Sequence, residues 1–253
     1  MKFSILTAVW NRAATLPDAL QSLDAQTYDD YEHVVQDGGS SDGTLELLNA
    51  RNDPRMRLVS ETDRGLYDAL NRATDRATGD VVGLLHSDDF FAHAEVLTRV
   101  AQVFEETGAD AVYGDLEYVS ARDTNKVVRH WVSGPYGPHN LKRGWMPPHP
   151  SLFIKRDVIT RWGGYDDSFQ ISADYDSILR YFGQGCISAA YLPEVLAKMR
   201  LGGASNGSVR RILRKSTEDY KAIRRNQVGG APTLIMKNAR KVPQLFMNKL
   251  RPN

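Results

Sequence analysis

The stretch that decides the fold is Asp80-Val81-Val82-Gly83-Leu84-Leu85-His86-Ser87-Asp88-Asp89-Phe90-Phe91. Four of the five residues from Val81 to Leu85 are apolar and two are β-branched, which is typical of a short strand buried on both faces of a parallel sheet. Two adjacent carboxylates follow this strand. Ligands of open α/β sheets bind beyond the carboxyl ends of the strands, so Asp88 and Asp89 are predicted to lie where a ligand binds.

Two interpretations of this carboxylate pair stand side by side. Adjacent carboxylates at a strand end are costly to bury unless a cation neutralises them, and a divalent metal ion is the obvious candidate. Alternatively, Asp88 is the N-cap of the next helix and Asp89 is a charge in its first turn. These residues alone favour neither.

Length and composition favour a cytoplasmic α/β protein. The 253 residues can bury a core, and the single cysteine, Cys186, excludes an intramolecular disulfide framework. The first residues run directly into a strand pattern without the long apolar region of a signal peptide. No stretch approaches the roughly 18 apolar residues that a membrane span requires.

The net charge of +1 hides a strong asymmetry along the chain. Residues 200–253 carry 13 Lys and Arg against 2 acidic residues, which gives +11 and leaves −10 for the rest. After Ser208, basic residues alternate with apolar ones, a composition typical of a helix that lies on an anionic membrane surface. The alternative is a solvated basic helix packed on the acidic body. Nucleic acid is a less favoured partner because no recognised binding motif accompanies the charge.

Strand and helix patterns alternate along the chain, which predicts parallel strands joined through helices. Strands are expected at 3–9, 32–36, 57–60, 81–85, 111–118, 151–154, 187–191 and 195–200. Helices are expected at 16–26, 44–48, 66–79, 95–107, 157–162, 174–183 and beyond 208, with Pro232 and Pro243 interrupting the last. Residues 133–150 are too irregular for an element and long enough for a functional loop.

A polar loop follows the second strand, Asp37-Gly38-Gly39-Ser40-Ser41-Asp42-Gly43. It lacks the Lys-Ser/Thr ending of a P-loop, and its two aspartates would repel phosphate. A carboxylate at this strand end is better placed to accept hydrogen bonds from a base or a ribose, the role we favour for Asp37. Asp42 serves equally well as a cap of the following helix.

Five motifs in order together resemble family 2 glycosyltransferases with a GT-A fold. They are residues 7–12, residues 36–44, Asp63-Arg64-Gly65, His86-Ser87-Asp88-Asp89 and Ser172-Ala173-Asp174-Tyr175-Asp176. The resemblance implies a GT-A domain over residues 1–206, with a Rossmann-like, mostly parallel central sheet flanked by helices. Residues 207–253 would form a basic helical C-terminal extension.

The resemblance also implies a donor site for a nucleotide sugar. Thr7, Val9, Asn11 and Arg12 would line the nucleotide pocket, Asp37 would contact the base and Arg64 would approach the diphosphate.

Asp88 matches the last acid of the family's DxD element, which holds Mg²⁺ or Mn²⁺ against both phosphates, and Asp89 would assist it. His86 replaces the first acid. We do not assign it to the metal, because hard divalent cations prefer oxygen ligands.

Asp174 occupies the position of the family's catalytic base, although Ala173 replaces the glutamate that commonly precedes it. Transfer with inversion needs a carboxylate that takes the proton of the acceptor hydroxyl on the face opposite the leaving nucleotide. Asp176 is a second choice. An N-cap is the structural alternative for Asp174, and both roles are compatible.

On the acceptor side, His149 lies where relatives place an acceptor loop and Trp145 could stack on a sugar ring, although a histidine beside prolines is more often structural. Residues 199–205 resemble the segment that closes over the diphosphate. Some relatives have a metal-binding histidine in that segment, and this chain has Arg200 and Ser205 as the expected phosphate contacts.

The expected function is therefore metal-dependent transfer of a sugar from a UDP- or GDP-sugar, with inversion, to a lipid-linked or polysaccharide acceptor. It would serve bacterial cell-surface glycan or glycolipid biosynthesis at the inner membrane face. One alternative is a nucleotidyltransferase, whose glycine-rich N-terminal loop is missing here. Another is a catalytically silent module that binds a sugar nucleotide or a glycan. A dehydrogenase is disfavoured because the chain lacks GxGxxG after its first strand.

Overall fold

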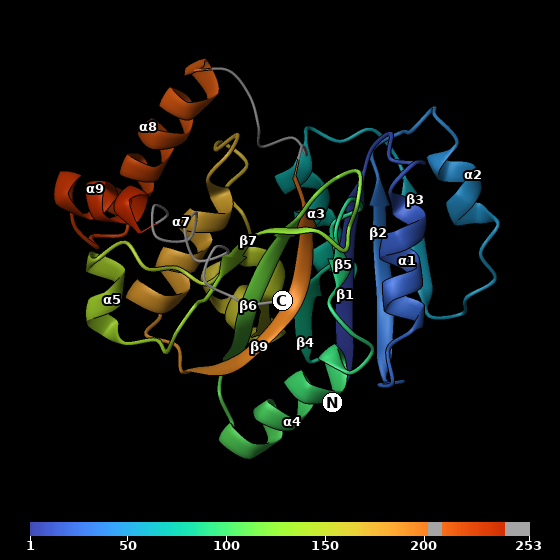
Figure 1. Ribbon diagram of the computed structural model, residues 1–253, viewed down its shortest axis with the longest axis horizontal. Helices are drawn as coiled ribbons and strands as arrows, with labels where there is room; N and C mark the ends of the chain where they lie inside the picture. Colours follow the sequence, from blue (N-terminus) through green and yellow to red (C-terminus); the bar gives the residue numbers. More distant parts are fainter. Residues whose placement is uncertain (202–208, 241–253) are drawn as a thin grey trace.

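The computed structural model describes residues 1–201 and 209–240. These residues form a nine-stranded sheet in the order β3-β2-β1-β4-β8-β6-β9-β5, with β7 paired to β6 (Figure 1). The strands are β1 (Phe3–Val9), β2 (Tyr31–Asp37), β3 (Met56–Ser60), β4 (Val81–Leu84), β5 (Phe90–Phe91), β6 (Ala111–Val119), β7 (Val127–Trp131), β8 (Leu152–Lys155) and β9 (Ala189–Arg200).

The central sheet is mostly parallel, as the resemblance implied. Strands β1 to β4 pair only in parallel with one another, and β9 is parallel to β6. Strand β8 runs antiparallel between β4 and β6, so β6 and β9 point the same way as β1 to β4. The carboxyl ends of all six strands therefore meet at one edge of the sheet.

Strand β4 lies at the centre of this sheet and is buried along its whole length, as its apolar run predicts. Gly83 faces the ring of Phe153 so closely that an added Cβ would lie 2.6 Å from a ring carbon. The glycine is therefore required by close packing inside the strand.

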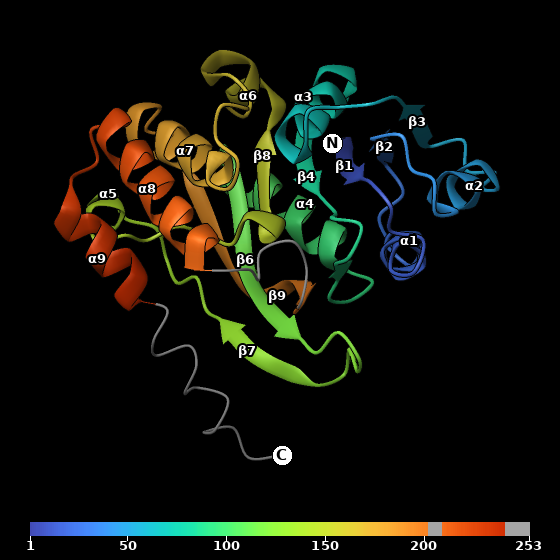
Figure 2. The same cartoon turned by 90° about the horizontal axis from the view of Figure 1, so that it is seen from above.

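Helices cover both faces of the sheet (Figure 2). Helices α3, α6 and α7 pack on one face, and α1 and α4 pack on the other. The helices are α1 (Leu16–Asp24), α2 (Thr44–Asn49), α3 (Leu66–Arg76), α4 (Val96–Thr107), α5 (Pro138–Lys142), α6 (Arg156–Trp162), α7 (Ala173–Leu179), α8 (Val209–Arg225) and α9 (Ala231–Ala239). The result is a three-layer α/β/α arrangement.

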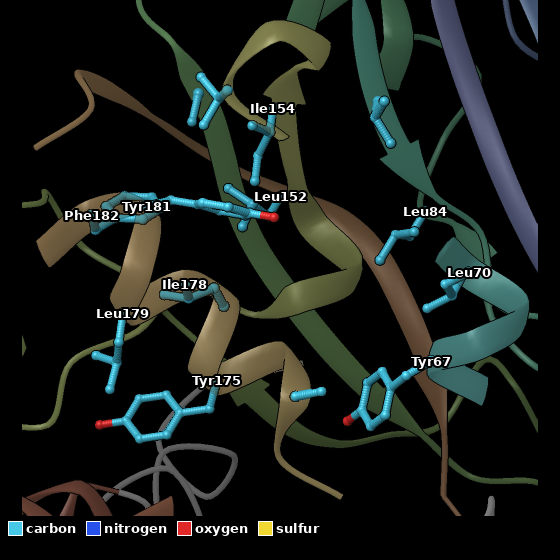
Figure 3. Close-up of a cluster of buried hydrophobic side chains, with 14 of the residues drawn as sticks. Tyr67, Leu70, Leu84, Leu152, Ile154, Tyr175, Ile178, Leu179, Tyr181 and Phe182 are labelled. Atoms are coloured by element: carbon cyan, nitrogen blue, oxygen red, sulfur yellow. The ribbon is translucent and has the colours of Figure 1, made fainter. Parts of the chain in front are cut away.

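The larger buried cluster lies between the sheet and helices α3 and α7 (Figure 3). Leu84 and Leu152 contribute from strands, Tyr67 and Leu70 from α3, and Tyr175 from α7. The cluster packs against the carboxyl end of β4. It therefore fixes the starts of α3 and α7 beside the carboxylates that follow β4.

Four regions differ from the sequence-based expectation. Residues 133–150, expected to contain no element, hold the short helix α5 and end at a 3₁₀ turn over His149–Ser151. Strands β5 and β7 were not expected. The two strands expected at 187–191 and 195–200 are one strand, because the register shift between Tyr113 and Asp115 opposite them accommodates Pro193 as a bulge.

The basic extension packs on the body wherever the structure describes it. Ala222, Ile223 and Val228 belong to the same buried cluster as α7. Helix α9 runs so close to Gly144 that an added Cβ there would lie 2.4 Å from the backbone nitrogen of Lys237. Residues 206 and 207, the expected domain boundary, lie outside the described residues.

Pro232 lies in the first turn of α9 and does not interrupt this helix. Pro243 lies outside the described residues. Among residues 1–201 and 209–240, no helix is both long and apolar enough to span a bilayer.

Candidate active site

The loops after β1 and β2 are joined by hydrogen bonds at the carboxyl edge of the sheet. The Asn11 backbone N–H donates to Ser40 Oγ at 2.8 Å, and Asn11 Oδ1 accepts the N–H of Ser41 at 2.9 Å. Asn11 has a φ of 51°, a conformation that asparagine tolerates better than most residues. The Arg12 N–H donates to Thr44 Oγ1 at 2.8 Å. Asn11 and Arg12 thus lie together at this rim.

Asp37 organises the loop that follows it. Its carboxylate accepts the N–H groups of Gly39 and Ser40, both at 3.1 Å, and the hydroxyls of Ser40 and Ser60. The side chain is fully buried. Contact with a base would require it to exchange one of these hydrogen bonds. Asp42 accepts the Thr44 N–H at 3.1 Å at the start of α2, but the N-cap of this helix is Gly43 and not Asp42.

Thr7 and Val9 are buried in β1, at 1% and 3% exposure. The Thr7 hydroxyl donates to the Leu85 carbonyl at 2.7 Å and lies 2.9 Å from His33 Nε2. Thr7 and Val9 were predicted to line the nucleotide pocket through backbone and side-chain contacts. That stays a prediction, and the side chains themselves pack inside the sheet.

The carboxylates after β4 do not cap a helix. The next element is strand β5, and α4 begins only at Val96. Asp88 is half-buried, and Asp89 is 3% exposed. Asp89 Oδ1 accepts the Arg200 N–H at 3.1 Å, whereas Oδ2 is buried without a hydrogen-bond partner among the described residues. Burial, and then the charge of Asp88, raise the pKa of Asp89 well above its ordinary value.

These two carboxylates suit a hard divalent cation in their donor atoms. The described residues bring together no group of three or more His, Cys, Asp or Glu side chains that could hold a metal ion. Mg²⁺ characteristically takes only one or two protein carboxylates and completes its shell with water and substrate phosphates. The buried, unpartnered Oδ2 of Asp89 beside Asp88 fits such a site.

Asp174 comes from the second position of α7 and approaches the same edge from the α3 side. Its Oδ1 lies 3.3 Å from the Tyr67 hydroxyl, and its charge acts on His86 together with that of Asp88. Ser172 is the N-cap, so Asp174 does not have that structural role. Asp176, the second choice for the base, is fully buried and accepts a hydrogen bond from Asn226 Nδ2 at 2.9 Å.

Two histidines and a tyrosine complete the cluster. His149 Nε2 lies 2.8 Å from the Tyr165 hydroxyl, and the rings of His86 and His149 are 6.2 Å apart. Burial lowers the pKa of both histidines, that of His149 to about 4, so both imidazoles are neutral near pH 7. We call His86, Asp88, His149, Tyr165 and Asp174 the edge cluster.

Tyr67 and Tyr165 were not predicted as site residues. Tyr67 follows the Asp63-Arg64-Gly65 motif, and Tyr165 lies in a turn between two glycines and two aspartates. The sequence feature that could have identified them is an aromatic residue next to a motif or turn that the sequence already singles out.

Trp145 does not face the site. It is 3% exposed, donates from Nε1 to the Ser133 carbonyl at 2.8 Å and packs on Tyr113, Tyr136 and Phe182. The prediction that it stacks on an acceptor sugar is wrong, because the indole ring of Trp145 is buried in the core.

The two arginines assigned to the diphosphate have carboxylate partners. Arg64 has an exposed side chain that pairs with Asp68 at 2.9 Å and with Asp167 at 2.7 Å. Arg200 pairs with Asp18, and its guanidinium lies over the ring of Phe90. Ser205 lies outside the described residues.

Comparison with known proteins adds independent information. The family described as glycosyl transferase family 2 matches residues 4–161. A PGL/p-HBAD biosynthesis glycosyltransferase of Mycobacterium bovis is 36% identical over 209 residues, which cover 81% of this chain and 79% of that protein. An uncharacterized glycosyltransferase of Mycobacterium tuberculosis is 32% identical over 70% of this chain and 67% of that protein.

Solved structures share the fold at lower identity. S. aureus TarS 1-349 in complex with UDP-GlcNAc superposes with a TM-score of 0.68 at 17% identity, covering 90% of this chain and 66% of that chain. The mannosyltransferase PcManGT of Pyrobaculum calidifontis, in complex with GDP-Man and Mn²⁺, gives 0.66 at 21% identity, covering 97% and 73%. The fold is GT-A, and the chain belongs to glycosyl transferase family 2.

Proposed function

We propose that this glycosyltransferase moves a sugar from a UDP- or GDP-sugar to a hydroxyl of a lipid-linked or polysaccharide acceptor, with inversion and with Mn²⁺ or Mg²⁺. Two similar structures were solved with UDP-GlcNAc and with GDP-Man and Mn²⁺, which supports this donor class. The M. bovis relative, named for PGL/p-HBAD biosynthesis, supports a role in bacterial glycolipid or cell-surface glycan synthesis.

The observation that carries the proposal is that Asp88 and Asp174 both lie close enough to His86 for their charges to act on its imidazole. The two carboxylates come from different elements, the end of β4 and the start of α7. A transfer reaction needs one such group on the leaving-group side and one on the attacking side. A divalent ion held by Asp88 and Asp89 would neutralise the charge of the departing diphosphate.

Asp174 takes the second role in this scheme. As the acceptor oxygen bonds to the anomeric carbon and the diphosphate leaves with the bonding electrons, the hydroxyl proton passes to Asp174. The neutral imidazole of His149 is part of the edge cluster and lies 2.8 Å from the Tyr165 hydroxyl. In this scheme it orients the acceptor hydroxyl. Asn11, Arg12 and Asp37 form the nucleotide rim.

The cationic complement of the diphosphate comes from arginine. Arg64 and Arg200 would exchange carboxylate partners for phosphate oxygens when the donor binds. Ser205 is assigned to the same contact, on the sequence motif alone.

The extension supports binding to an anionic membrane surface at the inner face of the plasma membrane. Ile212 and Leu213, both 64% exposed, lie on α8 next to the exposed Arg210 and Arg214. Exposed apolar side chains flanked by arginine suit the boundary between lipid headgroups and acyl chains. A lipid-linked acceptor would be presented at this boundary.

The experiment combines binding and turnover. Thermal shift with UDP and GDP, with and without Mn²⁺, tests the donor site, because a ligand of the native state raises Tm. Release of UDP from UDP-GlcNAc and of GDP from GDP-mannose tests the reaction. Asp88→Ala should lose the Mn²⁺-dependent Tm shift and turnover. Asp174→Asn should lose turnover and keep the shift.

Asp75→Asn, which changes an exposed carboxylate of α3, is the matched control. Wild-type turnover in Asp174→Asn would remove the assigned base. Nucleotide binding without release from either donor, by the wild type, would favour the silent binding module.

A further inference from the structure

The carboxylate of Glu218 on α8 lies against the backbone that leads into α7. It accepts the N–H groups of Gln170 at 3.2 Å, Ile171 at 2.8 Å and Ser172 at 3.0 Å. These three residues immediately precede the helix that carries Asp174. One side chain of the basic extension therefore binds three consecutive backbone donors beside the proposed base.

Arg225 of α8 and Asn226, which directly follows the helix, hold the same stretch at both ends. We call residues 166–176 the base segment. Asp166 pairs with Arg225, and Asp176 accepts from Asn226 Nδ2 at 2.9 Å in a buried contact. Lys221 Nζ lies 4.6 Å from the centre of the Phe169 ring. Contacts from successive turns of one helix thus follow the base segment along its length.

Helix α9 fixes α8 in turn. Lys237 Nζ lies 2.7 Å from Asp219 Oδ2, and both side chains are almost completely buried. The same ammonium group lies 3.5 Å from the centre of the Tyr175 ring, directly after Asp174 in the chain. Although burial raises it, the charges of Lys237 and Lys215 hold the pKa of Asp219 below its ordinary value, so the pair is ionised.

The opposite side of the base segment is held by α3. The Tyr67 hydroxyl lies 2.6 Å from the Ile171 carbonyl oxygen, the residue whose N–H Glu218 binds. Arg64, from the motif before α3, pairs with Asp167 at 2.7 Å. The segment therefore lies between the donor-side helix and the extension, and its position depends on both.

We infer that Glu218 is a positioning residue for catalysis, and that α8 sets the place of Asp174 relative to Asp88. The inference rests on the proposed function, because it takes Asp174 as the base. Three N–H groups bound to one carboxylate fix three successive peptide planes, which leaves the start of α7 little freedom to turn. Displacement of a catalytic group by about 1 Å costs about 10²-fold in rate.

The test is Glu218→Ala in the full-length protein, assayed for nucleotide release from UDP-GlcNAc and GDP-mannose with Mn²⁺. We expect kcat to fall about 10²-fold, with the KM for donor and the Mn²⁺-dependent Tm shift by UDP or GDP close to wild type. Hydrogen exchange at residues 170–172 should accelerate, because these amides lose their acceptor.

Thr217→Ala is the matched control, since Thr217 is the exposed neighbour on α8 and its hydroxyl donates to the Leu213 carbonyl within the same helix. Glu218→Gln is the second variant in case the alanine variant does not fold. It keeps one carbonyl oxygen and places an NH₂ donor against backbone donors, so kcat should fall about tenfold without a change in KM.

The outcomes separate the inference from the proposed function. Wild-type kcat in Glu218→Ala, or in Glu218→Gln when only that variant folds, overturns the inference while an inactive Asp174→Asn still supports the proposed base. Equal losses in donor binding and kcat also overturn it, because they indicate general damage. A wild type inactive with both donors removes the proposed function and the inference together.

Discussion

The hydroxyl of Tyr67 lies 2.6 Å from the carbonyl oxygen of Ile171 and 3.3 Å from Oδ1 of Asp174. Tyr67 and Asp174 are 107 positions apart in the chain. Each lies in the first turn of a helix that faces the carboxyl edge of the sheet. Burial, and then the charge of Asp174, raise the pKa of Tyr67 far above its ordinary value, so the hydroxyl keeps its proton. It is a permanent donor beside the proposed base.

Tyr67→Phe is therefore expected to reduce kcat for nucleotide release about tenfold, or about 1.4 kcal/mol, because one buried hydrogen bond is lost. Binding of UDP or GDP with Mn²⁺, measured by calorimetry, should not change. Tyr28→Phe is the control, since its hydroxyl donates to the Met1 carbonyl at 2.7 Å away from the site. Equal activity of the two variants would speak against a role of Tyr67 at Asp174.

Acid should destabilise the protein through His33. Burial lowers its pKa to about 4, and its Nδ1 has no hydrogen-bond partner among the described residues. Because the Thr7 hydroxyl donates to Leu85, His33 Nε2 must carry the proton that it shares with Thr7. A pKa lowered from 6.5 to about 4 contributes up to about 3 kcal/mol of stability, present above pH 6.5 and lost as the pH falls toward 4.

Urea unfolding at pH 7, 5.5 and 4.5 measures this effect. His33→Gln keeps a donor toward Thr7 without a titrating ring, so its stability should fall less over this range than that of the wild type. His139→Gln, at an exposed position, should follow the wild type. Parallel curves for all three proteins would show that His33 does not titrate on unfolding.

Gly144→Ala should separate α9 from the body. Gly144 has a φ of +71°, and an added Cβ would lie 2.4 Å from the Lys237 nitrogen. Gly134 has a similar φ of +67°, and apart from its chain neighbours no described residue has an atom within 4 Å of its Cβ position. Both alanine variants bear the cost of a left-handed residue, about 1–2 kcal/mol, and Gly144→Ala should lose a further 1–3 kcal/mol or so from the clash.

Thermal unfolding of the two variants decides this point. The expected result is a lower Tm for Gly144→Ala than for Gly134→Ala. The same Tm for both would mean that α9 moves away from Gly144 at no cost.

Membrane binding should depend on the exposed apolar side chains of α8. Replacing both Ile212 and Leu213 by Glu should reduce sedimentation with phosphatidylglycerol vesicles at least tenfold, because each apolar side chain contributes about 1.5–3 kcal/mol when buried. Val128→Glu, at an exposed position of β7, is the control. Binding that survives the double substitution, or equal binding to phosphatidylcholine, would contradict a role for this surface.

The sequence predicted the part of the fold that local pattern determines. No residue from Phe3 to Val9 is polar enough to interrupt a strand. The structure has a strand with these same bounds. Asp88 could be selected because it follows a buried strand, whereas Asp174 was selected through the resemblance to the family's catalytic base. Parallel strand direction places Asp88 at the carboxyl edge of the sheet, whereas Asp174 reaches His86 through the packing of α7.

The sequence could not predict contacts between distant segments. Trp145 was predicted to contact a sugar because its burial could not be recognised from the sequence. The rings that bury it, Tyr113, Tyr136 and Phe182, are spread over 70 residues of the chain. Helix α8 has the same amphipathic pattern whether it lies on lipid or on the body. What decides is that Glu218 meets three backbone N–H groups 46 to 48 positions earlier, and no periodicity encodes that.

The buried pair of Asp219 and Lys237 also orders events during synthesis of the protein. Domains form as units while the chain leaves the ribosome, and Lys237 emerges after every member of the edge cluster. Until then Asp219 is a carboxylate without its closest counter-charge, and α8 lacks the support of α9. The support that α9 gives to α8 is therefore complete only after the last described helix has been translated.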